Sequence, residues 1–183
     1  MEAPPRDIEE LTARIAAGLR PRFLFFWGHT RKQAGALGQE CLSQWFPAGF
    51  ELEGERFATA EHYMMWSKAR LFGDAAMARE ILTAGSPAEA KAFGRAVSNF
   101  DDQVWIQRRF DIVTRASIAK FSQNAELGAF LRGTGERVLV EASPRDCIWG
   151  IGLGAKNERA QNPAQWRGLN LLGFALMQAR AQL

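Results

Sequence analysis

The segment with the clearest chemical potential is TAEHYMMWSKARLFGD, residues 59–74. Glu61 and Lys68 stand seven residues apart at helical spacing, on a face that is otherwise apolar. A carboxylate in an apolar site has its pKa raised and can hold or deliver a proton at neutral pH. A lysine in such a site has its pKa lowered and becomes a usable nucleophile. The alternative is a buried ion pair, of Glu61 with Lys68 or with an arginine, that serves only packing.

A second group of polar residues follows the apolar run VLV at 138–140. Glu141 closes this run, and Asp146 follows it within the segment EASPRDCIWG. Functional side chains gather in loops at strand ends, so Asp146 is a candidate site residue. The alternative is that Asp146 is an ordinary turn residue after Pro144.

The glycines after Trp149 match a dinucleotide-binding pattern, G-x-G-x-x-A, through Gly150, Gly152 and Ala155. That fold needs a strand directly before the motif and a helix directly after it. Here KNERAQNP follows, which does not start a helix. We therefore reject a dinucleotide site. Gly150 remains a candidate binding residue, because glycines let a backbone approach a ligand closely, and a tight irregular turn is the alternative.

Three of the six tryptophans, Trp27, Trp105 and Trp149, stand beside charged residues or glycine. This position is compatible with stacking on a base, and burial in the core is the alternative. His29 and His62 are too few and too isolated for a metal site, and neither HExxH nor CxxC occurs. The sequence therefore predicts no metal and no cofactor. A serine nucleophile elbow is also missing.

The overall charge and composition favour a water-soluble protein with an anionic ligand. The formal charge is +3 and the pI is about 9.2, which favours anions slightly but is too weak to indicate nucleic acid. No run of 18 apolar residues occurs, so no membrane span is expected, and the start lacks a signal-peptide stretch. Cys41 and Cys147 lack metal-ligand spacing and are expected to be reduced thiols of a cytoplasmic protein.

The elements that must position these residues follow from periodicity and end signals. Thr59 caps the helix of Glu61 and Gly73 closes it. A hairpin turns at Glu53-Gly54, and residues 31–40 form a polar loop. Asp74 can cap the next helix, 75–84, and SPAE at 86–89 signals the start of another. We expect further helices at 7–19, 101–121, 124–133 and 170–183, and strands at 23–28 and 137–143. The fold class is α+β: a helix-rich single domain with a few short strands.

Taken together, these segments resemble the YbiA-like, or NADAR, superfamily from about Phe23 to the C-terminus. The matching pieces are FFWGH, CLSQWFPAGFELEGERFATAEHYMMWSKARLFGD, SPAEAKAFGR, KFSQNAEL, VLVEASPRDCIWGIGL and GLNLLGFALMQAR. The start departs from the shorter family form, which typically reads FLSNF. The resemblance implies a YbiA-like fold in one domain over residues 1–183, with residues 1–20 as an N-terminal helical extension.

The resemblance also implies N-glycosidase chemistry. One branch of the family hydrolyses the C1′–N bond of ribosylaminopyrimidine 5′-phosphate intermediates of riboflavin biosynthesis and releases ribose 5-phosphate. The alternative is the branch that removes ADP-ribose from guanine in nucleic acid, or a module that only binds ADP-ribose or NAD derivatives. The expected partner is thus a phosphorylated riboside or an ADP-ribose-type ligand, with nucleic acid not favoured. Carried onto this chain, the resemblance implies functional roles for Glu61, Trp105 and Asp146, with Lys68, Trp149 and Asn170 in support.

Within this chemistry, Glu61 acts on the sugar side or activates water, and Asp146 orients or protonates the leaving group. Trp105 or Trp149 stacks on the base. A second route, in which Lys68 forms a Schiff base with the ring-opened sugar, stays open. The phosphate is expected near Gly150 or at the helix start by Asn170.

Overall fold

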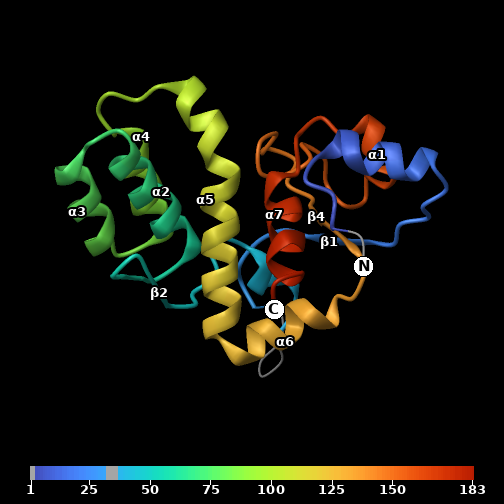
Figure 1. The fold of residues 1–183 in the computed structure, drawn as a ribbon, viewed down its shortest axis with the longest axis horizontal. Coiled ribbons are helices and arrows are strands. Elements are labelled where there is room, and N and C mark those ends of the chain that lie inside the picture. The colour runs from blue at the N-terminus through green and yellow to red at the C-terminus, as the bar shows by residue number, and fades with distance from the viewer. Residues whose placement is uncertain (1–2, 32–36) are drawn as a thin grey trace.

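A computed structural model describes residues 3–31 and 37–183 and has a helix-rich architecture with a few short strands (Figure 1). The helices are α1 (Ile8–Ala16), α2 (Ala60–Leu71), α3 (Ala75–Thr83), α4 (Pro87–Arg95), α5 (Asp102–Gln123), α6 (Ala125–Gly133) and α7 (Leu171–Arg180). The strands are β1 (Phe23–Phe26), β2 (Phe50–Leu52), β3 (Glu55–Phe57) and β4 (Val138–Glu141). Short 3-10 helices cover Gln39–Leu42, Glu158–Gln161 and Pro163–Gln165. The prediction of a helix-rich α+β fold is confirmed.

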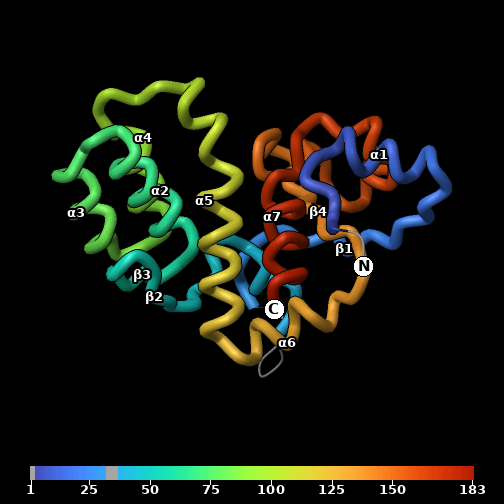
Figure 2. The backbone as a smooth tube through the Cα atoms, viewed as in Figure 1, coloured from blue at the N-terminus to red at the C-terminus, as the bar shows by residue number. Residues whose placement is uncertain are grey.

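The long helix α5 runs through the middle of the molecule (Figures 1 and 2). On one side it packs against α2, which also contacts α3 and α4. On the other side it packs against α7, which covers β4. Residues from two halves of the chain therefore meet along α5.

The two strand pairs differ in how far apart their partners lie in the sequence. β1 and β4 pair in parallel, with Phe26 beside Glu141 at their carboxyl ends. β2 and β3 form the predicted hairpin, and its turn residues Glu53 and Gly54 have φ values of 55° and 82°. Positive φ at both central residues is what a tight hairpin turn requires. The parallel pair brings the end of β4 into the interior, next to the loop that follows it.

The predicted helix signals act as expected at α2, α3 and α4. The side chain of Thr59 accepts the backbone N–H of His62, and Gly73 after α2 has φ 75°. Asp74 caps α3 through the N–H of Met77. The first two turns of α2 are buried on all sides, because α3, α4, α5 and the hairpin surround this helix. The sequence predicted one apolar face for this helix, whereas in the structure every side of its first two turns is buried.

Half of the polar loop predicted at 31–40 lies outside the described residues, since 32–36 are not described. The end of this segment forms the 3-10 helix Gln39–Leu42. Asn170 precedes α7 with φ 52°, and its side chain does not cap the helix. Both cysteines are free, with Cys41 buried and Cys147 exposed. Among the helices of the described residues, none is long and apolar enough to cross a bilayer.

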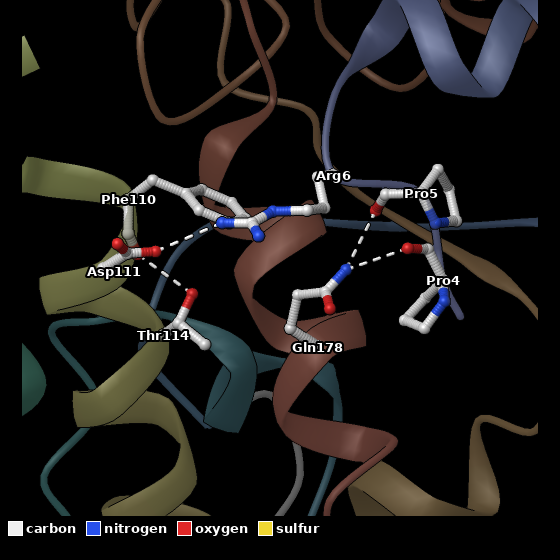
Figure 3. A network of polar contacts seen from close by, with 7 residues as sticks. All are labelled: Pro4, Pro5, Arg6, Phe110, Asp111, Thr114 and Gln178. Atoms are coloured by element: carbon white, nitrogen blue, oxygen red, sulfur yellow. Dashed lines mark hydrogen bonds and ion pairs between the residues drawn. The ribbon is translucent and has the colours of Figure 1, made fainter. Parts of the chain in front are cut away.

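The N-terminal segment is held across α5 and α7 (Figure 3). The Gln178 amide donates to the carbonyl oxygens of Pro4 and Pro5 at 2.9 and 3.3 Å. The Arg6 guanidinium lies 5.2 Å from the Phe110 ring centroid and pairs with Asp111 at 3.2 Å. These contacts fix the segment that leads into α1.

Candidate functional site

A cleft of about 120 Å³ lies where α2, α4 and α5 meet the loop after β4. Its lining combines a carboxylate, three cations, two tryptophans and two methionines: Glu61, Met64, Met65, Lys68, Lys91, Gly94, Arg95, Trp105 and Trp149. The helical spacing of Glu61 and Lys68 thus places both on the same cleft.

Glu61 is a buried carboxylic acid with an open hydrogen-bonding position. The residue is 2 % exposed, and its Oε1 atom has no hydrogen-bond partner among the described residues. Burial raises the pKa of Glu61 to about 7, and the negative charge of Asp146 adds to the shift. Lys91, the Trp45 side chain and Arg95 oppose this shift. A carboxyl group with a pKa near neutrality can serve as a general acid or base.

The backbone at Glu61 is held by a segment that a buried lysine supports. The Glu61 N–H donates to the Gln44 carbonyl oxygen at 3.1 Å. Just before it, Lys120 of α5 donates from Nζ to the carbonyl oxygens of Cys41 and Ser43 at 2.7 and 2.8 Å. Lys120 is 1 % exposed, and burial lowers its pKa to about 7. The start of α2 is therefore anchored to α5 through residues 41–44.

Lys68 faces the cleft as a cation without a carboxylate partner. Its Nζ donates to the Gly94 carbonyl oxygen at 2.7 Å and lies 4.1 Å from the Phe100 ring centroid and 5.8 Å from that of Trp105. Burial lowers the pKa of Lys68. The structure contains no ion pair between Glu61 and Lys68, so the packing alternative does not hold for these two residues.

Asp146 shapes the loop that carries Trp149. Its Oδ1 accepts the backbone N–H groups of Ile148 and Trp149, both at 2.8 Å. Its carboxylate is close enough to raise the pKa values of Glu61 and Glu141. Asp146 therefore does act as a turn residue, and it also belongs to the electrostatic environment of Glu61.

Glu141 is a site residue that sequence reasoning noted only as the end of a strand. Its Oε2 atom is buried without a hydrogen-bond partner. Burial, then Asp146, then Glu61 raise the pKa of Glu141 to about 8, and Lys91 opposes the shift. The available signal was an acidic residue that directly follows three buried apolar residues of β4.

Lys91 and Arg95 were also missed. They lie one turn apart on α4 and line the cleft, and both act on the pKa of Glu61. Their spacing of four residues places them on one helix face. The sequence contained that spacing, but only the packing of α4 against α2 turns it toward Glu61.

The aromatic candidates divide between the cleft and the surface. Trp105 and Trp149 line the cleft. Trp27 is 58 % exposed and does not belong to the lining. His29 contacts Trp45, with 5.6 Å between their ring centroids, and Lys91 lies 5.8 Å from the Trp45 ring centroid.

Gly150 and Asn170 hold the loop and strand together. A Cβ atom at Gly150 would lie 2.8 Å from the Glu141 carbonyl oxygen, so the close approach requires glycine. The Asn170 side chain accepts the Glu141 N–H at 2.9 Å and donates to the Leu139 carbonyl oxygen at 3.0 Å. Both atoms of its amide are thus used to fix β4. The N–H groups of residues 151, 152 and 170–172 also bond to backbone carbonyl oxygens, so none is open to a phosphate.

Within residues 3–31 and 37–183, no group of three or more His, Cys, Asp or Glu side chains is arranged to hold a metal ion. Of the three acidic residues discussed above, Glu61 shares its cleft with cations and tryptophans.

Comparison with known proteins gives a consistent result. Residues 25–183 match the NADAR domain family. The N-glycosidase R617 of Acanthamoeba polyphaga mimivirus is 43 % identical over 166 residues, which cover 88 % of this chain and 96 % of that protein. The N-glycosidase Npun_R5314 of Nostoc punctiforme is 34 % identical and covers 78 % of this chain and 85 % of its own length. The N-glycosidase YbiA of Escherichia coli is 33 % identical over 73 % of this chain and 74 % of its own length.

A solved structure supports the same relationship. The NMR structure of the E. coli protein YbiA superposes with a TM-score of 0.68 and 27 % sequence identity, and the match covers 90 % of this chain and 86 % of that one. The similarity therefore extends to the arrangement of helices and strands.

Proposed function

Since this chain belongs to the NADAR domain family and is an N-glycosidase, we propose that it hydrolyses the C1′–N bond of a ribosylaminopyrimidine 5′-phosphate of riboflavin biosynthesis and releases ribose 5-phosphate. The observation that supports this proposal most directly is Glu61, which lines a cleft together with cations and tryptophans and whose buried Oε1 atom has no hydrogen-bond partner among the described residues.

The chemistry of the bond explains why such a cleft is suitable. Breaking the C1′–N bond develops positive charge on the sugar and negative charge on the leaving nitrogen. Glu61 stabilises the sugar cation or removes a proton from the attacking water. Trp105 and Trp149, which line the cleft, stack on the base. Asp146 orients the leaving group or protonates it.

The phosphate is best accommodated by α4. Lys91 and Arg95 line the cleft one turn apart, and the N–H groups of residues 151, 152 and 170–172 are already bonded. A lysine with an arginine provides both a point charge and a planar donor set for phosphate oxygens. We therefore assign the phosphate to Lys91 and Arg95, and not to the start of α7.

A Schiff-base route through Lys68 is part of the proposal. Ring opening turns C1 into an imine of the base amine. Attack of the neutral Lys68 amine on C1 displaces the base amine and leaves an imine between C1 and Lys68, and water hydrolyses this imine to free ribose 5-phosphate and the lysine. The lowered pKa of Lys68 and its position against Phe100 and Trp105 support this route. Direct attack by water is the competing route.

ADP-ribosylated guanine is the larger of the two candidate substrates. The cleft volume of about 120 Å³ is below the roughly 300–1,000 Å³ of pockets that hold drug-sized ligands, a size class to which both substrates belong, so the incubations below decide between them. A guanine de-ADP-ribosylase would need room for two phosphates, a second nucleoside and a flipped base.

Two parallel incubations test this choice. The protein is incubated with a ribosylaminopyrimidine 5′-phosphate and, separately, with DNA that carries ADP-ribosylated guanine. We expect release of ribose 5-phosphate in the first reaction. Release of ADP-ribose alone, with DNA affinity that falls steeply with salt, would overturn the proposed substrate.

Borohydride added during turnover separates the two hydrolytic routes. We expect a ribose phosphate adduct on Lys68, located by mass spectrometry. Lys68→Arg should abolish the adduct, because a guanidinium stays protonated and cannot attack. Lys156→Arg, at an exposed site outside the cleft, provides the control. Absence of the adduct together with an active Lys68→Arg variant would favour direct hydrolysis.

A further inference from the structure

From Glu61, which lines the cleft, and from Glu141 at the end of β4, whose buried Oε2 atom has no hydrogen-bond partner among the described residues, we infer that Glu141 is the general acid of the reaction, the group that protonates the leaving nitrogen. This inference rests on the proposed function and adds a catalytic residue to it. It replaces Asp146 in that role and leaves Asp146 as the residue that shapes the loop.

The first support is the fixed position of the Glu141 backbone. Its N–H donates to the Asn170 side chain at 2.9 Å, and its carbonyl oxygen accepts the Ile151 N–H at 2.9 Å. Gly150 lies so close to that carbonyl oxygen that a Cβ atom there would clash. The end of β4 is thus held by Ile151 of the following loop on one side and by Asn170 on the other, which limits where the Glu141 carboxyl group can lie.

The second support is that the carboxyl group has no structural task. Its Oε2 is buried and makes no hydrogen bond within the described part of the chain, although buried polar groups are almost always bonded. Asp146 differs in this respect, because its Oδ1 already accepts two backbone N–H groups. An open buried carboxyl group is available to a ligand atom.

The third support is the crowding of like charges. Glu61 and Asp146 each raise the pKa of Glu141, and Lys91 is the one cation that acts against them on Glu141. Carboxyl groups that share a site do not all ionise, so one of them keeps a proton. Both carboxyl groups have raised pKa values, about 7 for Glu61 and about 8 for Glu141, so the pair holds a proton at neutral pH. Lys91, Arg95 and the Trp45 side chain favour the ionised form of Glu61, whereas Lys91 favours that of Glu141, so we assign the proton to Glu141.

The step balances without another reactant. As the C1′–N bond breaks, its electron pair moves to nitrogen, and the Glu141 carboxyl proton is transferred to that nitrogen. On the direct-hydrolysis route the oxygen of water bonds to C1′, and the Glu61 carboxylate takes one proton from this water. The proton then moves from Glu61 to Glu141, which restores both groups for the next turnover.

The test compares two leaving groups in Glu141→Gln, Glu61→Gln and the control Glu126→Gln, which changes an exposed residue of α6. An aminopyrimidine leaves only with a proton, whereas 4-nitrophenolate leaves without one. We expect Glu141→Gln to lower kcat at least about a hundredfold on the aminopyrimidine riboside phosphate and less than about fivefold on the 4-nitrophenyl riboside phosphate. Glu61→Gln should lower both rates. Equal losses on both substrates in Glu141→Gln, or no loss on either, would overturn the inference.

A measurement without substrate separates this inference from the proposed function. Carbon-13 NMR of glutamate-labelled protein follows the carboxyl titrations directly. We expect the resonance lost in Glu141→Gln to titrate above the Glu61 resonance, and the Glu61 titration to shift to lower pH in that variant. A Glu141 titration below that of Glu61 would refute the inference. If wild-type protein cleaves neither riboside, the proposed function fails whatever the NMR result.

Discussion

The interior contains charged groups buried in two contrasting ways. Lys120 is fully buried, and its Nζ bonds to the carbonyl oxygens of Cys41 and Ser43. Glu61 is buried and Glu141 is half-buried, and each has one buried carboxyl oxygen without a hydrogen-bond partner in the part of the chain that the structure describes. Buried charge is costly unless it is paired or hydrogen-bonded. The Lys120 ammonium is hydrogen-bonded within the protein, whereas the free carboxyl oxygens of the two glutamates remain available to a bound ligand.

The difference gives a physical criterion for function. A buried charge with complete bonding stabilises the fold, and its loss should show in stability. A buried acid with an open oxygen destabilises the fold and is explained by chemistry with a substrate. The two regions are also connected, because the segment that Lys120 holds ends at Gln44, which accepts the Glu61 N–H. The following predictions test this contrast.

The largest expected effect is on stability, at Lys120. Lys120→Met keeps the length of the side chain but leaves the Cys41 and Ser43 carbonyl oxygens unbonded. At about 1–3 kcal/mol for each buried unsatisfied group, the free energy of unfolding should fall by roughly 2–6 kcal/mol. Urea denaturation measures this loss, and Lys156→Met at an exposed site is the control. An unchanged midpoint would show that Lys120 is not a structural anchor.

At Glu61 the effect should appear in catalysis and leave the fold intact. Glu61→Gln keeps the shape of the side chain but cannot exchange a proton. Turnover should fall at least about a hundredfold, the usual scale for a general acid or base. Steady-state kinetics measures this change, and circular dichroism checks folding. Near-normal turnover in the folded variant would give Glu61 a structural role and remove the contrast with Lys120.

Substitution of Asp146 should have an intermediate effect on turnover, because this residue holds the loop of Trp149 and also places a negative charge near Glu61 and Glu141. Asp146→Asn retains an oxygen for the N–H groups of Ile148 and Trp149 but loses the negative charge. We expect kcat to fall about tenfold, with a smaller change in KM, if the charge acts in the transition state. A change confined to KM would make Asp146 a binding residue only.

Local chemistry made much of the fold predictable from the sequence. The Thr59 cap, the Asp74 cap and the Glu53-Gly54 turn depend on residues within a few positions of one another, and each forms as predicted. The pairing of β1 with β4 was not predicted, because its partners are far apart in the chain and both strands are short. That pairing places Glu141 where its carboxyl group faces other acids.

In the candidate site, too, positions set by local spacing were predictable, and contacts between distant segments were not. Helical spacing placed Glu61 and Lys68 together, and the structure has both on one cleft. Lys91 and Arg95 share a helix face by the same rule, yet the sequence does not say which element that face meets. The sequence placed Asn170 at the start of the last helix, and in the structure its side-chain amide bonds to the distant strand β4.

The smallest expected effect concerns the dependence of stability on pH. The pKa values of Glu61 and Glu141 are raised in the folded protein, from 4.5 to about 7 and about 8. Between pH 4.5 and these values the folded state binds more protons than the unfolded state, so each group lowers stability as the pH rises. Lys120, with its pKa lowered to about 7, acts in the opposite direction, but only above about pH 7.

Glu141→Gln should therefore weaken the decline in stability between pH 5 and pH 6, where Lys120 is protonated in both states. Measured against the wild type, the gain at pH 6 over pH 5 should be on the order of 1 kcal/mol, since one pH unit between the two pKa values corresponds to about 1.4 kcal/mol. For a chain of this length that is a rise in Tm of about 2–4 °C. Thermal unfolding at both pH values measures it, with Glu126→Gln as the exposed control. A Glu141→Gln variant whose Tm differs from the wild type equally at pH 5 and pH 6 would mean that the buried acid carries no cost in the folded state. The distinction between a bonded lysine that stabilises the fold and an open acid that weakens it would then be wrong.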